Sequence, residues 1–228
     1  MAVNKKTISY LKLGSIFALL SGFFWTVSII ISQLIPSVLR GSASLAFFEK
    51  AKNYSTFILI KDWSNILGYL CFIAVIMVFN HLARPENRAY MSWVNILILI
   101  GLGSALYEYV EAARNFLPMI DTMSSMSIEV KKIYARYLFY SSDSFLLWHL
   151  TACIWFTIVS GLAWSNKMIP KYLVILGLLL GFSNGVAFVG IINSDRALID
   201  SYQLFSLILI PLWSIVEGAF LWVLAKKL

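Results

Sequence analysis

The sequence predicts an all-α fold, a polytopic bundle of about six transmembrane helices, and three observations support it. The chain has 228 residues, of which 60% are apolar and 13% are charged, with a mean hydropathy of +0.81. Soluble domains carry far more charge, about a quarter of their residues. Six stretches are apolar over roughly 20 residues, the length that crosses the hydrocarbon core of a bilayer. Charged residues gather between these stretches, so an ordinary soluble domain is excluded.

The first predicted span covers residues 10–35 and follows a basic segment that contains Lys5, Lys6 and Lys12. Such a start resembles a signal peptide, but the apolar run is longer than the roughly 7–15 residues of a signal-peptide core. We therefore expect a retained helix. In residues 36–64, apolar side chains recur near helical spacing between charged ones, which predicts an amphipathic segment on the outer surface.

The next three spans are predicted at residues 65–83, 92–117 and 139–164. The third span ends before Pro118 in this prediction. The connection that follows resembles the first one, because apolar and basic residues alternate near helical spacing, and it predicts a second amphipathic segment. Three methionines lie along one face of it: Met119, Met123 and Met126.

The last two spans are predicted at residues 170–192 and 202–224. Small residues at four-residue spacing let another helix backbone approach the fifth span closely, either within the bundle or from a second subunit. These residues are Gly177, Gly181 and Gly185. Pro211 is expected to kink the sixth span. Because the connections are short, residues 1–228 are expected to form a single integral membrane domain.

Both termini are expected in the cytoplasm. Basic residues are equally frequent on the two sides, but the connections on the side of the termini are shorter and hold fewer acids. The positive-inside bias acts most strongly in short connections near helix ends. The net charge of +7 comes from such positions and not from a dense basic stripe, so the expected partner is the lipid bilayer and not a nucleic acid.

Polar or small residues share one face of the third span, at spacings of three, four, three and three residues: Gly101, Ser104, Glu108, Glu111 and Arg114. A polar face on an apolar helix points into the bundle, a cavity or a partner. Glu111 and Arg114 can pair along the helix, which leaves Glu108 in need of another partner or a proton.

Counting along the spans from their outer ends places Glu108, His149 and Asn184 at a similar depth, with Asp143 nearer the mouth. These positions support the hypothesis of an outward-facing polar pocket, lined by the first three residues and Glu111. A Glu–His pair there would relay protons, bind a cation or act as general acid and base. The alternative is that the same side chains form structural hydrogen bonds between helices.

Glu217 stands apart in the inner half of the sixth span, beyond Pro211, and would mark the second end of a polar path. The chain has two histidines, His81 and His149, at different expected depths. It contains no metal-binding motif, no phosphate-binding loop and no nucleophile elbow. We therefore predict no metal, no cofactor and no nucleophilic catalysis.

Residues 140–228 carry a pattern of helix, short basic turn, proline, helix and glycine, and then a closing proline, glutamate and Leu-Trp pair. The residues are Leu147-Trp148-His149-Leu150, the stretch from Gly161 to Gly177 with Pro170, and Pro211, Glu217 and Leu221-Trp222. This pattern resembles a bacterial family of six-span membrane proteins, the DUF4386 group. The resemblance implies a six-helix protein of the bacterial cytoplasmic (inner) membrane without an established activity, and it transfers no functional residue.

These features support three functional hypotheses. The first is a non-enzymatic protein, transporter-like or ligand-responsive, with an outward pocket on the third and fourth spans. The second is a structural or accessory subunit that docks on a second copy of this chain or on another membrane protein, through the face of Gly177, Gly181 and Gly185. The third is a membrane-embedded enzyme for a lipid-soluble substrate, with Glu108 and His149 as acid and base.

Overall fold

The computed structural model describes residues 5–36, 50–82, 87–133, 143–166 and 169–228. Within these ranges the chain consists of helices joined by short turns and contains no strand. The long helices are α1 (Lys5–Leu34), α3 (Ser55–Leu82), α4 (Arg88–Ser124), α6 (Asp143–Trp164), α7 (Lys171–Ile192) and α8 (Arg196–Lys227), and a short 3-10 helix, η2 (Ala51–Tyr54), precedes α3. Each of the six long helices overlaps one predicted span, so the all-α prediction with six long apolar helices is confirmed.

Four helices, α1, α3, α4 and α8, are longer than their predicted spans, and two of them, α3 and α4, extend into the predicted amphipathic segments. Helix α3 begins at Ser55, ten residues before the predicted start at residue 65, and α4 continues through Pro118 to Ser124. The prediction that the amphipathic segments lie apart from the spans is therefore wrong at residues 55–64 and 118–124. Residues 37–49, which belong to the first of these segments, lie outside the described part of the chain.

Packing explains why the helices extend this far. A small apolar core joins four elements: the end of α1, η2, α3 and α4. Its buried side chains are Ile35, Ala51, Ile58, Phe116 and Ile120. Burial on both sides of Pro118 holds α4 helical, although proline removes one backbone hydrogen bond. An exposed ion pair between Lys52 and Asp121, 3.1 Å apart, joins η2 to α4 at the same level.

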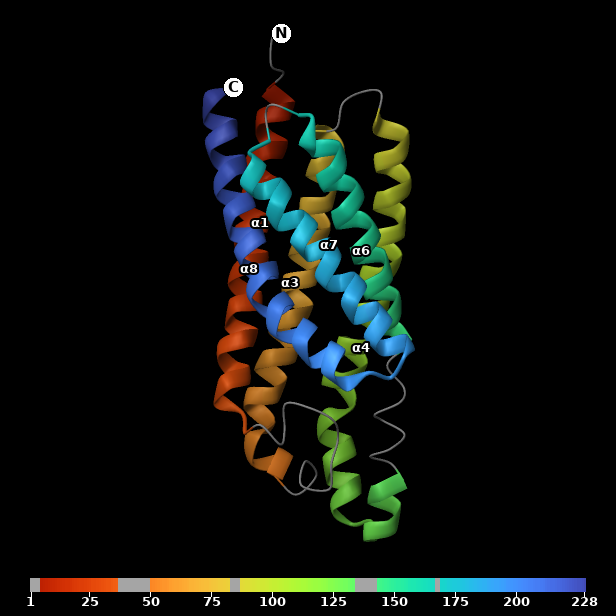
Figure 1. Ribbon diagram of the computed structural model, residues 1–228. Helices are drawn as coiled ribbons and strands as arrows, with labels where there is room; N and C mark the ends of the chain where they lie inside the picture. The colour runs from red at the N-terminus through yellow and green to blue at the C-terminus, as the bar shows by residue number, and fades with distance from the viewer. Residues whose placement is uncertain (1–4, 37–49, 83–86, 134–142, 167–168) are drawn as a thin grey trace.

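The six long helices form a closed ring in chain order. Each packs against the next along the sequence, and α8 returns to pack against α1. Both termini lie at one end of the bundle, which we name the terminal end, and we name the opposite end the distal end (Figure 1). At the distal end α1, α3 and α4 project beyond the turn between α7 and α8 (Figure 1). With 37 residues, or ~55 Å of helix, α4 is longer than a hydrocarbon core is thick.

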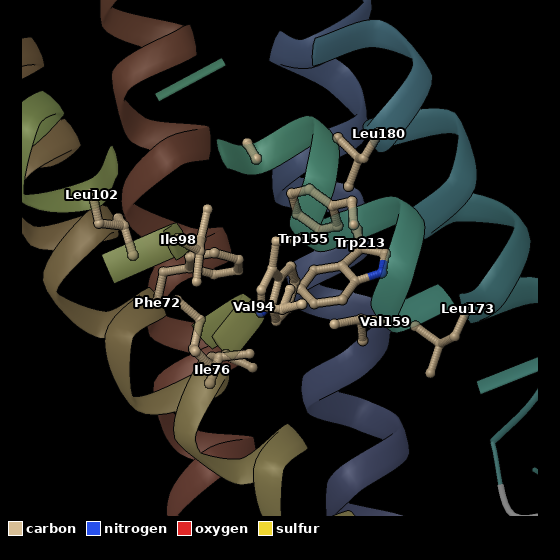
Figure 2. Close-up of a cluster of buried hydrophobic side chains, with 14 of the residues drawn as sticks. Phe72, Ile76, Val94, Ile98, Leu102, Trp155, Val159, Leu173, Leu180 and Trp213 are labelled. Atoms are coloured by element: carbon tan, nitrogen blue, oxygen red, sulfur yellow. The ribbon is translucent and has the colours of Figure 1, made fainter. Parts of the chain in front are cut away.

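Four aromatic side chains fill the centre of the helix bundle. Phe72 of α3, Trp155 and Phe156 of α6 and Trp213 of α8 are all in mutual contact, with centroid distances of 5.0 to 6.1 Å. Aliphatic side chains surround them, among them Ile98 of α4 (Figure 2). We name these four residues the aromatic cluster. Such pairs contribute about 0.5–1.5 kcal/mol each beyond their burial, so the cluster stabilises the centre of the bundle. Because it lies between the distal half and the terminal half, we also call it the partition.

The outer surface of the ring is apolar. Large side chains such as Phe23, Phe182 and Ile208 are more than half exposed. A soluble protein rarely exposes contiguous apolar surface on this scale. Six helices of this length and hydropathy, with apolar exteriors, make this a multi-pass membrane protein whose helix exteriors face lipid.

The glycine face of α7 packs inside the bundle. A Cβ atom at Gly181 would lie 2.5 Å from Thr157 Oγ1, and one at Gly185 would lie 3.1 Å from Cys153 Sγ, both on α6. A Cβ atom at Gly177 would collide with Ser160 of the same helix. Because α6 occupies this face, the hypothesis of an accessory subunit that docks through the three glycines loses its surface.

Candidate functional site

Three polar side chains from α6, α7 and α8 meet at one oxygen atom. Asn184 Oδ1 lies 3.1 Å from His149 Nδ1 and accepts a hydrogen bond of 2.9 Å from the Tyr202 hydroxyl. The His149 and Tyr202 rings also touch edge to face, with centroids 4.7 Å apart. All three side chains are buried, and Asn184 is 0% exposed. We name them the His149 network.

The Asn184 amide fixes the protonation of the histidine. Its Nδ2 donates to the Leu180 carbonyl at 2.8 Å, so Oδ1 must face His149 and Tyr202. An amide oxygen can only accept, and His149 Nδ1 therefore carries a proton. In the neutral ring Nε2 is then a proton acceptor, and no hydrogen bond to a described residue occupies it. His149 can gain a proton at Nε2 without breaking the bond to Asn184.

Local sequence brings these residues together. Gly181 and Gly185 flank Asn184 on α7 and let α6 approach closely, so a short amide side chain can cross the helix interface. The turn into α8 is equally tight, because the Asp195 side chain caps that helix by accepting from Ala197 and Leu198 backbone N–H groups. This turn returns α8 beside α7 and delivers Tyr202 to the same level.

An aromatic wall adjoins the network. Tyr69 of α3 contacts Trp148, the neighbour of His149, at 5.0 Å between centroids, and Tyr109 of α4 at 5.8 Å. Tyr109 in turn contacts Phe145 of α6 at 5.4 Å. These contacts join α3, α4 and α6 in the distal half of the bundle. In the ring of helices, α3 and α4 lie on one side of α6, and α7 and α8 lie on the other side.

Two carboxylates lie near this wall. The side chains of Asp62 and Glu108 are both within electrostatic range of Tyr109, as is the Tyr202 hydroxyl. Asp62 is 6% exposed and pairs with Lys61, whose Nζ is 3.1 Å from Oδ1. The distal half therefore holds a histidine, two carboxylates and three tyrosines on interior or half-buried faces of four helices: α3, α4, α6 and α8.

The structure brings some of the predicted site residues together and leaves others apart. It brings His149 and Asn184 together, but the described partners of His149 are Asn184 and Tyr202, and Glu108 is not among them. Glu111 lies nearer the surface, where it accepts from Asn115 at 2.7 Å and lies 3.9 Å from Arg114.

Exposed pairs of the Glu111–Arg114 kind contribute little, about 0–1 kcal/mol. Arg114 is exposed on α4, and Glu111 beside it is half-buried. Asp143 is the first residue of α6, and its side chain lies outside the described part of the chain.

Two members of the site, Asp62 and Tyr202, were not predicted from the sequence. Asp62 was assigned to a connection, yet it follows the interior positions of α3 at helical spacing, with Ile58 before it and Ile66 and Tyr69 after it. That spacing is the signal that identifies it. Tyr202 stands at a predicted span start, where tyrosine is common as an interface residue, so its position alone gave no signal.

Metal binding finds no support in the described residues. No three histidine, cysteine, aspartate or glutamate side chains in the described ranges come together to hold an ion.

A cavity of about 200 Å³ lies along the last turns of α4, and the predicted methionine face lines it. Its lining residues are Asn115, Pro118, Met119, Thr122, Met123 and Met126, none of which belongs to the His149 network.

The sequence was compared with family models, curated proteins and solved structures, and none of them matches it. The resemblance to the DUF4386 group therefore stands on its quoted residues alone.

Proposed function

We propose that the protein is a small transporter-like membrane protein that moves protons together with a solute, and that His149 is its proton acceptor in the distal half. The observation that carries this proposal is the single oxygen, Asn184 Oδ1, on which α6, α7 and α8 converge. An ionisable residue inside a membrane bundle is costly, and such residues usually line substrate or proton pathways.

The depth of the network supports access from the distal side. His149 and Tyr202 each lie six residues from the distal starts of α6 and α8, or ~9 Å along the helix. Asn184 lies eight residues from the distal end of α7, or ~12 Å. His149 is the most exposed of the three, at 9%, against 5% for Tyr202 and 0% for Asn184. A path for water or a polar solute from the distal end to the imidazole would therefore be only ~9 Å long.

Protonation would couple to helix position. A charged imidazolium strengthens its hydrogen bond to Asn184, because charge-assisted bonds are roughly twice as strong as neutral ones. The same oxygen holds Tyr202, so any shift of α8 against α6 and α7 changes how well the proton is held. This shared bond supplies a physical link between proton binding and rearrangement of three helices.

We further propose that the terminal end faces the cytoplasm. Exposed basic residues gather at that end of the described helices: Lys12, Lys171, Lys226 and Lys227. Lys226 lies over the Trp222 ring, as in the aromatic and basic belt of a membrane interface. The distal half, with the His149 network, would then open to the outer side.

The test is proton entry into liposomes that contain the purified protein and a trapped pH-sensitive dye. The outside is made acidic, and entry is recorded alone and with a panel of amino acids, sugars and small organic cations. We expect entry above that of protein-free liposomes in at least one condition, and its loss in His149→Gln. His81→Gln, which changes the other histidine, is the matched control. Wild-type liposomes that match empty ones in every condition would disprove the proposal.

A further inference from the structure

Glu217 is a second ionisable residue in the interior, and among the described residues it has no hydrogen-bond partner. It lies on α8, is 0% exposed, and neither carboxyl oxygen has a hydrogen-bond partner in the described part of the chain. Ser214, one turn earlier on the same face, is also 0% exposed, and its hydroxyl likewise has no partner. Two unbonded polar side chains at one level are uncommon in a close-packed interior.

The surroundings of Glu217 are apolar. One turn towards the distal end stands Trp213 of the aromatic cluster, and one turn towards the terminal end stands Leu221, which packs with Leu11 of α1 and Val78 of α3. The adjacent Gly218 lets α1 approach, and its carbonyl accepts from Ser15 at 2.7 Å.

No described charge faces the Glu217 carboxyl. On α1 the nearest ionisable residue, Lys12, is exposed. On α7, Lys171 and Tyr172 are exposed at the terminal end. On α3 and α6, the described residues include no ion-pair or hydrogen-bond partner for it. The side chains of Asn80 and His81, near the end of α3, lie outside the described part.

These surroundings decide the state of the carboxyl group. A carboxylate without a partner is strongly unfavourable away from water, and the group takes up a proton instead. The structure thus holds a neutral acid within the membrane-spanning part of α8. A neutral acid without a hydrogen bond still costs stability, so packing alone gives no reason for a glutamate at this position.

We propose that Glu217 is a second proton-binding site, in the terminal half, which exchanges its proton when α8 moves. Pro211 lies six residues earlier, where the missing backbone N–H gives the helix a point of bending. Fifteen residues of α8, or ~22 Å, separate Tyr202 from Glu217, and the aromatic cluster lies between them. The two proton sites therefore lie on opposite sides of one partition.

This inference goes beyond the proposed function and stands without it. The burial of Glu217 does not involve His149, so the failure of either site leaves the other untouched. Its ligand is a proton, and its effect would be to give α8 two protonation states, of which burial without a hydrogen-bond partner favours the neutral one.

The test is infrared difference spectroscopy of the purified full-length protein in lipid, titrated from acidic to alkaline pH. We expect a carbonyl band of a protonated carboxylic acid at neutral pH that disappears at alkaline pH. Glu217→Gln should lack the band, whereas Glu108→Gln and His149→Gln should retain it. Circular dichroism and gel filtration confirm that each variant is folded.

Two results would overturn the inference. If Glu217→Gln removes no acid band at any pH, the carboxyl is ionised and the site is not the one described. If the band persists in folded protein throughout the titration, Glu217 is permanently neutral and exchanges no proton. Loss of proton entry in His149→Gln with an unchanged Glu217 band would separate the two sites.

Discussion

Asn184 reaches His149 across the interface of α6 and α7, with 3.1 Å between Oδ1 and Nδ1, because glycines flank it on the same helix. The spacing of these glycines would also suit the docking of a second subunit. Here it allows a hydrogen bond to form within one chain. Packing and site are therefore one feature, and a change in the glycines should affect both.

Gly181→Ala is expected to destabilise the bundle. The new Cβ atom would lie 2.5 Å from Thr157 Oγ1 and 3.1 Å from the Thr157 backbone nitrogen, so α6 must shift. Overpacking of this kind costs about 1–3 kcal/mol. Thermal unfolding followed by circular dichroism in detergent measures the loss.

Gly103→Ala is the matched control for that change, because nothing lies within 4 Å of a Cβ atom at Gly103 on α4. It should leave stability equal or raise it by up to ~1 kcal/mol, since alanine favours helix over glycine. Light scattering should give the same particle mass for both variants and wild type. A Gly181→Ala variant that halves the mass without loss of stability would restore the docking hypothesis.

Asn184→Leu should remove the hydrogen bond that holds neutral His149 in the tautomer with its proton on Nδ1. In wild type the amide oxygen requires a proton on Nδ1, so the neutral ring has its lone pair on Nε2. Nitrogen-15 spectra of labelled imidazole distinguish the two tautomers directly. With His81→Gln as background, a single histidine remains to be observed. A wild-type ring with the proton on Nε2 would refute the assigned hydrogen-bond pattern.

The order and the apolar middles of the long helices followed from the sequence because membrane spans are set by apolar length. Counting along straight helices also brought His149 and Asn184 to one level, since every residue rises by the same amount. Rotation about the helix axis has no such simple rule. For that reason the expected Glu108–His149 pair does not appear among the contacts of His149, and Tyr202 takes the place beside it.

The ends of the helices were less predictable than their middles. Pro118 marks a boundary in most sequence patterns, yet burial of Phe116 and Ile120 on either side of it outweighs the lost hydrogen bond. Asp62 was hidden by the same error, because an acid in an assumed connection attracts no attention. Tertiary packing of α1, α3 and α4, which no local pattern contains, decided both.

Asn95→Leu should lower the stability of the bundle, because it removes a hydrogen-bond acceptor of the Trp155 indole. Trp155 Nε1 donates to Asn95 Oδ1 at 2.9 Å in the interior, and this bond holds one ring of the aromatic cluster to α4. A buried donor left without its acceptor costs about 1–3 kcal/mol. Thermal unfolding of Asn95→Leu should therefore shift to lower temperature.

The double change Asn95→Leu with Trp155→Phe tests whether that cost belongs to the bond. Replacing both partners by apolar groups is nearly neutral, whereas removing one leaves the other unsatisfied. The pair should therefore be more stable than the sum of the two single losses. Strict additivity of the single changes would show that the bond contributes nothing to the stability of the partition.

Glu217→Met should raise the stability of the bundle. The wild-type carboxyl is fully buried without a hydrogen bond, and the transfer of such a group into an apolar interior costs about 1–3 kcal/mol by the measure of protein substitutions. Methionine has nearly the same length and a flexible, apolar side chain that adapts to the space. Ser214→Ala removes the other unbonded group and should stabilise as well, while Glu111→Met at the surface should change little.

A gain in stability at Glu217 combined with a loss of proton entry would give the residue a functional reason to be there. Proteins retain destabilising polar groups where activity requires them, so the two measurements on one variant separate function from packing. Stability that falls in Glu217→Met would instead show that the carboxyl makes a bond in the membrane that holds α8 in place. In that outcome the acid is structural, and His149 remains the one proton acceptor that the geometry supports.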